Sequence, residues 1–100
     1  MLLGYRKLTE YDITIFQTPR AGGSKDYNQV YRYHVQAKTH QEALEKTFKL
    51  FNVADTLPKD YQSRYIGTGD ILLIDEGRKG QTYYKLFSDG WKPINRMHVC

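Results

Sequence analysis

The side chains of this chain that could act as nucleophiles, bases or metal ligands are few and scattered. Apart from the acids, they are three histidines, three serines and one C-terminal cysteine. The serines lack a Gly-x-Ser-x-Gly context, and a single cysteine offers no Cys/His spacing for zinc. His40 would lie in the first turn of a helix, a weak position for a base, and His34 is interpreted as a surface or satisfied histidine. Because nucleophile, base and orienting group are all missing, we expect no enzyme, no metal and no cofactor.

Two glycine-containing stretches do not match the sequence motifs of phosphate-binding loops. Residues 67–70 (GTGD) precede an apolar run instead of a helix and lack the spacing of a dinucleotide-binding loop. Residues 77–80 (GRKG) lack the P-loop pattern. Both stretches are therefore interpreted as turns in a β-rich segment.

Basic and aromatic residues are the more informative side chains. The chain carries 15 Lys and Arg against 11 acids, nine tyrosines and one tryptophan. Surfaces that bind single-stranded nucleic acid combine cations for the phosphates with rings that stack on bases. We therefore predict a nucleic-acid-binding surface formed by Arg20, Lys25, Tyr27, Arg78, Lys79 and Trp91. The alternative for the aromatic residues is packing in the core or in a subunit interface, and for Arg78 and Lys79 it is a solvated turn.

Hydrophobic periodicity predicts the elements that must position these residues. Leu8–Phe16 and Tyr27–Ala37 alternate apolar and polar residues, which indicates two half-buried strands around a long, basic loop. Gly67–Ile94 predicts a three-stranded antiparallel meander that begins with the apolar run Ile71–Ile74. That run is apolar on both faces, so another element must cover it.

One helix is predicted between the two groups of strands. Thr39 and Glu42 have the spacing of a capping box, and Asn52 is a plausible terminator. Apolar residues recur at helical spacing between them: Ala43, Leu44, Thr47, Phe48 and Phe51. This face is the natural cover for the Ile71–Ile74 strand.

The predicted order is β-β-α-β-β-β in a single domain of residues 1–100, mainly β and of the α+β class. Five short strands favour a small, strongly bent, five-stranded antiparallel open barrel of the Sm/SH3 kind. The alternative is a flat sheet with the helix on one face. No apolar run is long enough to span a membrane, and the lone terminal cysteine favours a reducing cytoplasm.

Two resemblances to known families accompany these patterns. Residues 67–74, followed by Thr82-Tyr83-Tyr84 and Gly90-Trp91, resemble YodL-like modules of phages and mobile elements over about the last third of the chain. By length and order of segments, the whole chain also resembles a family of small marine-metagenome proteins thought to come from cyanophages, whose fold is similar to Sm/LSm proteins. That second resemblance implies a bent open barrel, edge-to-edge assembly into a ring and RNA binding by loop residues. The helix here follows two strands instead of preceding all of them, and residues 77–80 are not the Sm Arg-Gly motif, so no Sm residue is carried over.

We therefore expect a module that binds RNA or single-stranded DNA as a ring-shaped homo-oligomer. It would act in the cytoplasm, that of the host if the protein is of phage origin. The alternative is a protein-interaction or structural phage accessory protein that pairs through exposed strand edges.

Overall fold

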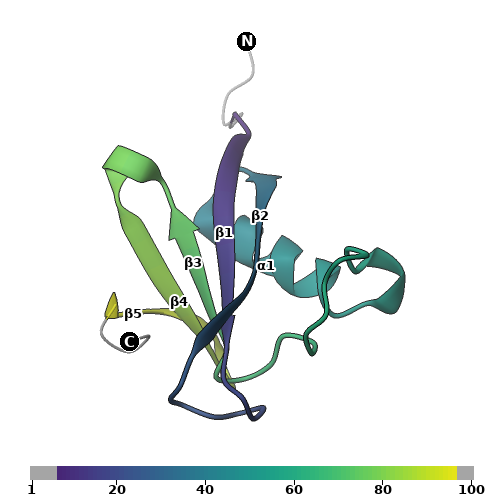
Figure 1. Cartoon of the computed structure of the whole chain (residues 1–100). Helices are drawn as coiled ribbons and strands as arrows, with labels where there is room; N and C mark the ends of the chain where they lie inside the picture. Colours follow the sequence, from purple (N-terminus) through teal and green to yellow (C-terminus); the bar gives the residue numbers. More distant parts are fainter. Residues whose placement is uncertain (1–6, 97–100) are drawn as a thin grey trace.

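The computed structural model describes residues 7–96, which form five strands and one α-helix (Figure 1). In chain order the elements are β1 (Thr9–Gln17), β2 (Asn28–Ala37), α1 (His40–Leu50), η1 (Ala54–Thr56), β3 (Ile71–Asp75), η2 (Gly77–Lys79), β4 (Gln81–Phe87) and β5 (Gly90–Ile94). The strands form one sheet in the order β2-β1-β3-β4-β5, and every neighbouring pair is antiparallel. The prediction of a mainly β domain with five antiparallel strands and one helix is confirmed.

The sheet is open and does not close into a barrel. β2 and β5 lie at its two edges, and α1 packs along one face of the twisted sheet (Figure 1). The connection through α1 brings β3 beside β1, and the two end strands, β2 and β5, do not pair with each other. The arrangement is therefore close to the alternative of a sheet with a helix on one face, and the Sm/SH3-like barrel is not confirmed.

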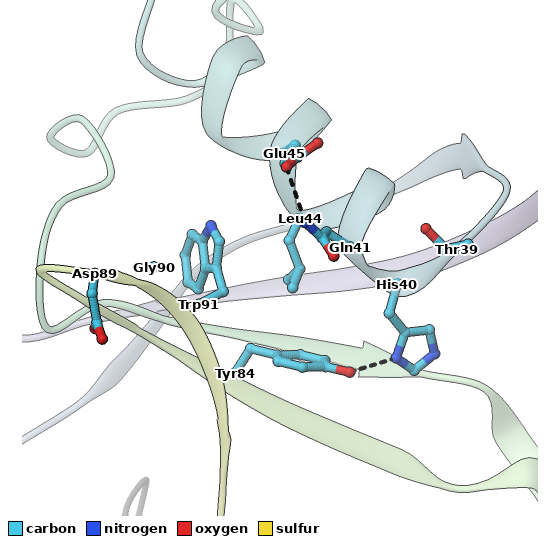
Figure 2. A pocket seen from close by; sticks show the side chains of 9 residues that line it. All are labelled: Thr39, His40, Gln41, Leu44, Glu45, Tyr84, Asp89, Gly90 and Trp91. Carbon is cyan, nitrogen blue, oxygen red and sulfur yellow. Dashed lines mark hydrogen bonds between the residues drawn. The ribbon is translucent and has the colours of Figure 1, made fainter.

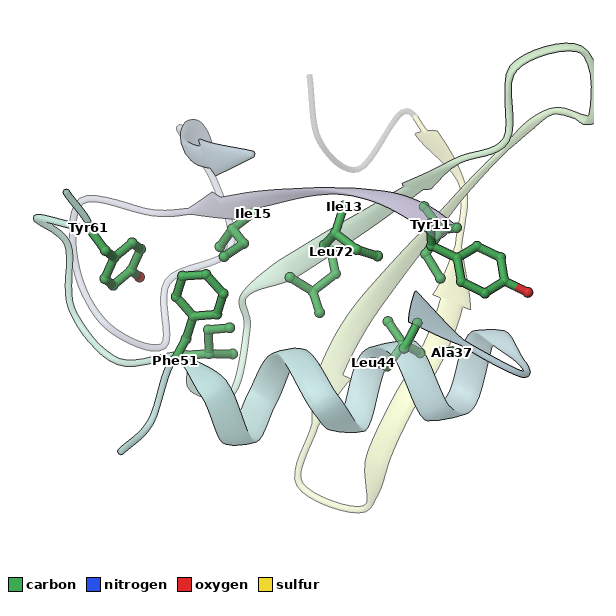
Figure 3. Close-up of a cluster of buried hydrophobic side chains, with 11 residues drawn as sticks. Tyr11, Ile13, Ile15, Ala37, Leu44, Phe51, Tyr61 and Leu72 are labelled. Atoms are coloured by element: carbon green, nitrogen blue, oxygen red, sulfur yellow. The ribbon is translucent and has the colours of Figure 1, made fainter. Parts of the chain in front are cut away.

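The hydrophobic core lies between α1 and the sheet (Figure 3). The predicted apolar faces of β1 and α1 supply it, and Ile13, Ile15 and Phe51 have no exposed surface. Leu72 and Ile74 of β3 point into the same cluster, so α1 covers the apolar strand as predicted. Each fully buried side chain of this kind stabilises the fold by about 1.5–3 kcal/mol.

A β-bulge explains the irregular pattern of β2. Ile15 pairs with Tyr31 and Phe16 pairs with Gln29, so Val30 is an extra residue in the ladder. Val30 therefore packs against the core although it interrupts the alternation of the strand. The predicted face of Tyr31, Tyr33, Val35 and Ala37 contacts the core.

Side chains at both ends fix the position of α1. The Glu42 N–H donates to Thr39 Oγ1 (3.1 Å), and the Lys38 N–H donates to Glu42 Oε1 (2.6 Å), one residue earlier than in a standard capping box. After the helix, the Asn52 side chain makes two hydrogen bonds to the backbone of Ile66 (2.7 and 2.9 Å). These bonds hold the long connection to β3 against the end of α1.

A buried polar network anchors the start of β3. The Asp70 carboxylate is 1% exposed and accepts hydrogen bonds from Arg64 (3.0 Å), Gln17 (3.0 Å) and the Gly67 N–H (2.9 Å). Burial raises the pKa of Asp70, and these three donors act in the opposite direction. The GTGD stretch is therefore a structural turn, as the sequence predicts.

Candidate nucleic-acid interface

The two predicted basic loops lie at opposite ends of the sheet. Arg20 and Lys25 are exposed in the β1–β2 loop, and Arg78 and Lys79 are exposed in η2 between β3 and β4. Because β3 runs antiparallel to β1, the loop after β1 and the turn after β3 emerge at opposite ends (Figure 1). The structure therefore does not bring the six predicted residues into one surface.

The two predicted stacking residues are engaged in packing. The Tyr27 hydroxyl donates to the Gly69 carbonyl (2.5 Å), and burial raises the pKa of Tyr27. Trp91 is half-buried, packs against the core and lines a cleft beside the start of α1 (Figure 2). Trp91 therefore fits the alternative of core packing, whereas Tyr27 is partly buried and tied by its hydroxyl to the turn before β3.

The face of the sheet opposite α1 brings other aromatic residues together. Ile71 and Leu73 alternate with the core residues Leu72 and Ile74, so they point away from α1. No helix of residues 7–96 covers this outer face, yet Ile71 is fully buried and Leu73 is 8% exposed. The rings of Phe16 and Tyr83 shield β3, with 6.3 Å between their centroids and 43° between their planes. The outer surface of this part of the sheet is therefore aromatic.

Two lysines flank an exposed aromatic ring on the same face. Lys85 of β4 is directly opposite Lys92 of β5, and both ammonium groups lie over the Phe87 ring, 5.6 and 5.7 Å from its centroid. Phe87 is 37% exposed. Like charges at opposite positions of two strands repel each other. Asp89 pairs with Lys92 (2.9 Å), whereas Lys85 is in no ion pair within residues 7–96.

A cleft of about 510 Å³ adjoins this cluster at the η2 end of the sheet. Its lining consists of Gly77, Gly80, Gln81, Thr82, Tyr83, Ile94 and Arg96. We call this hollow the Tyr83 cleft. Arg96 is the one cation in this lining; Arg78 and Lys79 lie between the two glycines in the sequence, and Lys79 lines a separate hollow with Tyr11, Asp75 and Glu76.

The sequence contained a signal for this surface. Tyr83, Lys85 and Phe87 are spaced two apart, so one face of β4 had to carry all three. The tight turn at Ser88–Gly90 then sets the register that places Lys92 opposite Lys85. Lys85, Lys92 and Arg96 were absent from the predicted site because charge on adjacent strands becomes visible only with that register.

Two other features of residues 7–96 bear on possible ligands. Within this range no three His, Cys, Asp or Glu side chains are grouped closely enough to hold a metal ion. No helix there has the length and apolarity needed to cross a membrane.

Comparisons with known proteins extend the YodL-like resemblance over almost the whole chain. The family model of the YodL-like domain matches residues 4–96. The "Uncharacterized protein YodL" of Bacillus subtilis (strain 168) is 54% identical over 94 residues, which cover 94% of this chain and 90% of that protein. No solved structure matches the chain significantly.

Proposed function

The chain belongs to the YodL-like domain family, and from the side chains on its outer sheet face we propose that it binds single-stranded nucleic acid. The observation that carries this proposal is the juxtaposition of Lys85 and Lys92 across the exposed Phe87 ring. A ligand with negative charges and planar rings would relieve the repulsion and use the aromatic surface.

The surface has the length and composition for several nucleotides. The Tyr83 cleft offers one ring for stacking, and Arg96 in its lining supplies positive charge. The Lys85–Phe87–Lys92 cluster continues the same face along β4 and β5. A base in the cleft and phosphates along the lysines would use both parts. Each stacked base contributes about 1–3 kcal/mol in proteins of this kind.

The binding unit in this proposal is a single copy of the chain, not a ring. A ring assembled edge to edge needs two strand edges that accept another chain. β5 carries Pro93, which has no N–H to donate, and β2 carries the bulge at Val30. Both features oppose edge pairing.

Titration of labelled oligothymidylate and oligouridylate of about 12 nucleotides tests the proposal, because single-stranded sites span roughly 4–16 nucleotides. Fluorescence anisotropy across a salt series should show affinity falling as salt rises, by about 0.7 in the log–log slope for each phosphate contacted. The double variant Lys85→Gln with Lys92→Gln should lower that slope by about 1.4.

A matched control removes the same charge at the other end of the sheet. Arg20→Gln with Lys25→Gln changes two exposed residues of the β1–β2 loop and should leave affinity and slope unchanged. No binding at low salt would refute the proposal. A larger loss of affinity in the control than in the Lys85/Lys92 variant would show that the interface lies at the β1–β2 loop.

A further inference from the structure

A second cleft, of about 640 Å³, lies between the first turns of α1 and the β4–β5 hairpin (Figure 2). Its lining consists of Thr39, His40, Gln41, Leu44, Glu45, Tyr84, Asp89, Gly90 and Trp91. Tyr84 and Trp91 point toward α1, whereas Lys85 and Lys92 point to the outer face, so the cleft is separate from the proposed nucleic-acid interface. We infer that this cleft binds a small organic cation through a primary ammonium or guanidinium group.

Two lining residues, His40 and Tyr84, are hydrogen-bonded to each other, and His40 is also hydrogen-bonded to Glu76 behind the cleft. His40 Nε2 lies 2.9 Å from Glu76 Oε1, and His40 Nδ1 lies 2.8 Å from the Tyr84 hydroxyl oxygen. An ionised carboxylate only accepts, so Nε2 carries the proton, and in neutral imidazole Nδ1 then accepts the Tyr84 O–H. The Tyr11 ring packs edge-on against the imidazole, with 5.3 Å between centroids, and holds its orientation.

Because the Tyr84 hydroxyl donates its hydrogen to His40, the Tyr84 oxygen can only accept a hydrogen bond from a ligand. The lining also holds the polar side chains of Thr39 and Gln41 and two carboxylates. Glu45 accepts from Gln41 Nε2 (3.4 Å) and Asp89 pairs with Lys92 (2.9 Å), and both carboxylates keep oxygen lone pairs that can accept from a ligand. Figure 2 shows the Trp91 ring between Asp89 and Leu44, with Tyr84 nearby. Tryptophan is the best aromatic partner for a cation. Acceptors, negative charge and an indole ring together select a cationic donor.

An anion is the less suitable occupant although a helix begins here. Free N–H groups at a helix start attract negative charge. The capping contacts of Thr39 and Glu42 already use part of this end, and Glu42 places a carboxylate there. No lysine or arginine lines the cleft. Glu45 adds a further negative charge, so the cleft disfavours anions.

Trp91 is the only tryptophan, so its fluorescence reports on the cleft without background. The probes are 1,4-diaminobutane, 1,4-butanediol and succinate, three four-carbon chains with positive, neutral and negative ends, used at equal ionic strength. We expect a saturable change with the diamine alone. Tyr84→Phe should weaken its binding about tenfold by removing one acceptor for a charged donor, and Glu45→Gln about threefold.

A control variant completes the experiment. Asp55→Asn removes one exposed carboxylate in η1, outside the cleft, and should leave diamine affinity unchanged. Equal responses to diamine and diol would overturn the inference, as would an undiminished affinity in Glu45→Gln, whose exposed site does not endanger folding. These outcomes are independent of whether the outer face binds nucleic acid.

Discussion

The rings of Phe16 and Tyr83 close over β3 from the strands on its two sides, with 6.3 Å between their centroids. They come from β1 and β4, which flank β3, and they lie on the face that α1 does not cover. This pair accounts for the burial of Ile71 and Leu73 without a second layer of structure. Tyr83, which shields the strand, is also the residue that we propose to stack on a base.

Tyr83→Ala should therefore reduce both stability and nucleic-acid affinity. We expect a loss of about 2 kcal/mol in the free energy of unfolding, less than for a fully buried ring, and a loss of about 1–3 kcal/mol in binding. Tyr83→Phe keeps the ring and should preserve both. Urea unfolding and anisotropy measure the two effects, and Tyr65→Ala, at a 51% exposed tyrosine, is the control. If folded Tyr83→Ala binds the oligonucleotide as tightly as the wild type, the Tyr83 ring is not part of the interface.

Gly69→Ala should destabilise the protein by about 1–3 kcal/mol. Gly69 has a φ of +96°, and a Cβ there would lie 2.9 Å from the backbone carbonyl oxygen of Gly23. The β1–β2 loop would have to move away from the start of β3. Gly67→Ala is the matched control because a Cβ there meets no atom within 4 Å. Thermal unfolding of the two variants should give clearly different midpoints, and equal midpoints would contradict the close approach.

Asp70→Ala should cost about 3 kcal/mol in the free energy of unfolding, since it removes the ion pair with the partly buried Arg64 and the carboxylate that accepts from Gln17 and the Gly67 N–H. Asp75→Ala is the comparison: that carboxylate is more exposed and accepts from the Gly77 N–H and the Gln81 amide. Its loss should cost about 1 kcal/mol or less. Urea midpoints that rank the two variants in reverse order would show that the Asp70 network is not an anchor.

The elements could be predicted from the sequence because their signals are local. The alternation of β1 and the spacing of Leu44, Phe48 and Phe51 define faces by geometry within one element. The open sheet could not be predicted in the same way, because the pairing of β1 with β3 joins segments more than 50 residues apart. For the same reason, no single stretch of the sequence indicated that the two basic loops lie far apart. Nor did any stretch indicate that His40 contacts Glu76 and Tyr84.

Tyr33 should make stability fall in alkaline solution. Burial raises the pKa of Tyr33 to about 12, against the opposing effect of its hydrogen bond with Thr47 (2.7 Å). Since the folded pKa exceeds the unfolded value of 10.0, this stabilisation is present below pH 10 and is lost as pH rises from 10 to about 12. The loss attributable to Tyr33 should be about 2 kcal/mol.

Comparison with Tyr33→Phe isolates this effect, because the folded state also raises the pKa of four other tyrosines: Tyr27, Tyr31, Tyr61 and Tyr84. Both proteins should lose stability above pH 10, and the wild type should lose more. Urea midpoints measured on either side of that range provide the test. Parallel losses in the two proteins would mean that the Tyr33 phenol is not shielded from water.

The location of the nucleic-acid interface is tested most directly by NMR titration of the ¹⁵N-labelled protein with unlabelled oligothymidylate. The proposal predicts that backbone amide shifts concentrate on β4 and β5, at Tyr83, Lys85, Phe87, Lys92 and Ile94, and leave residues 18–26 unchanged. Shifts confined to residues 18–26, or no shifts at low salt, would contradict it.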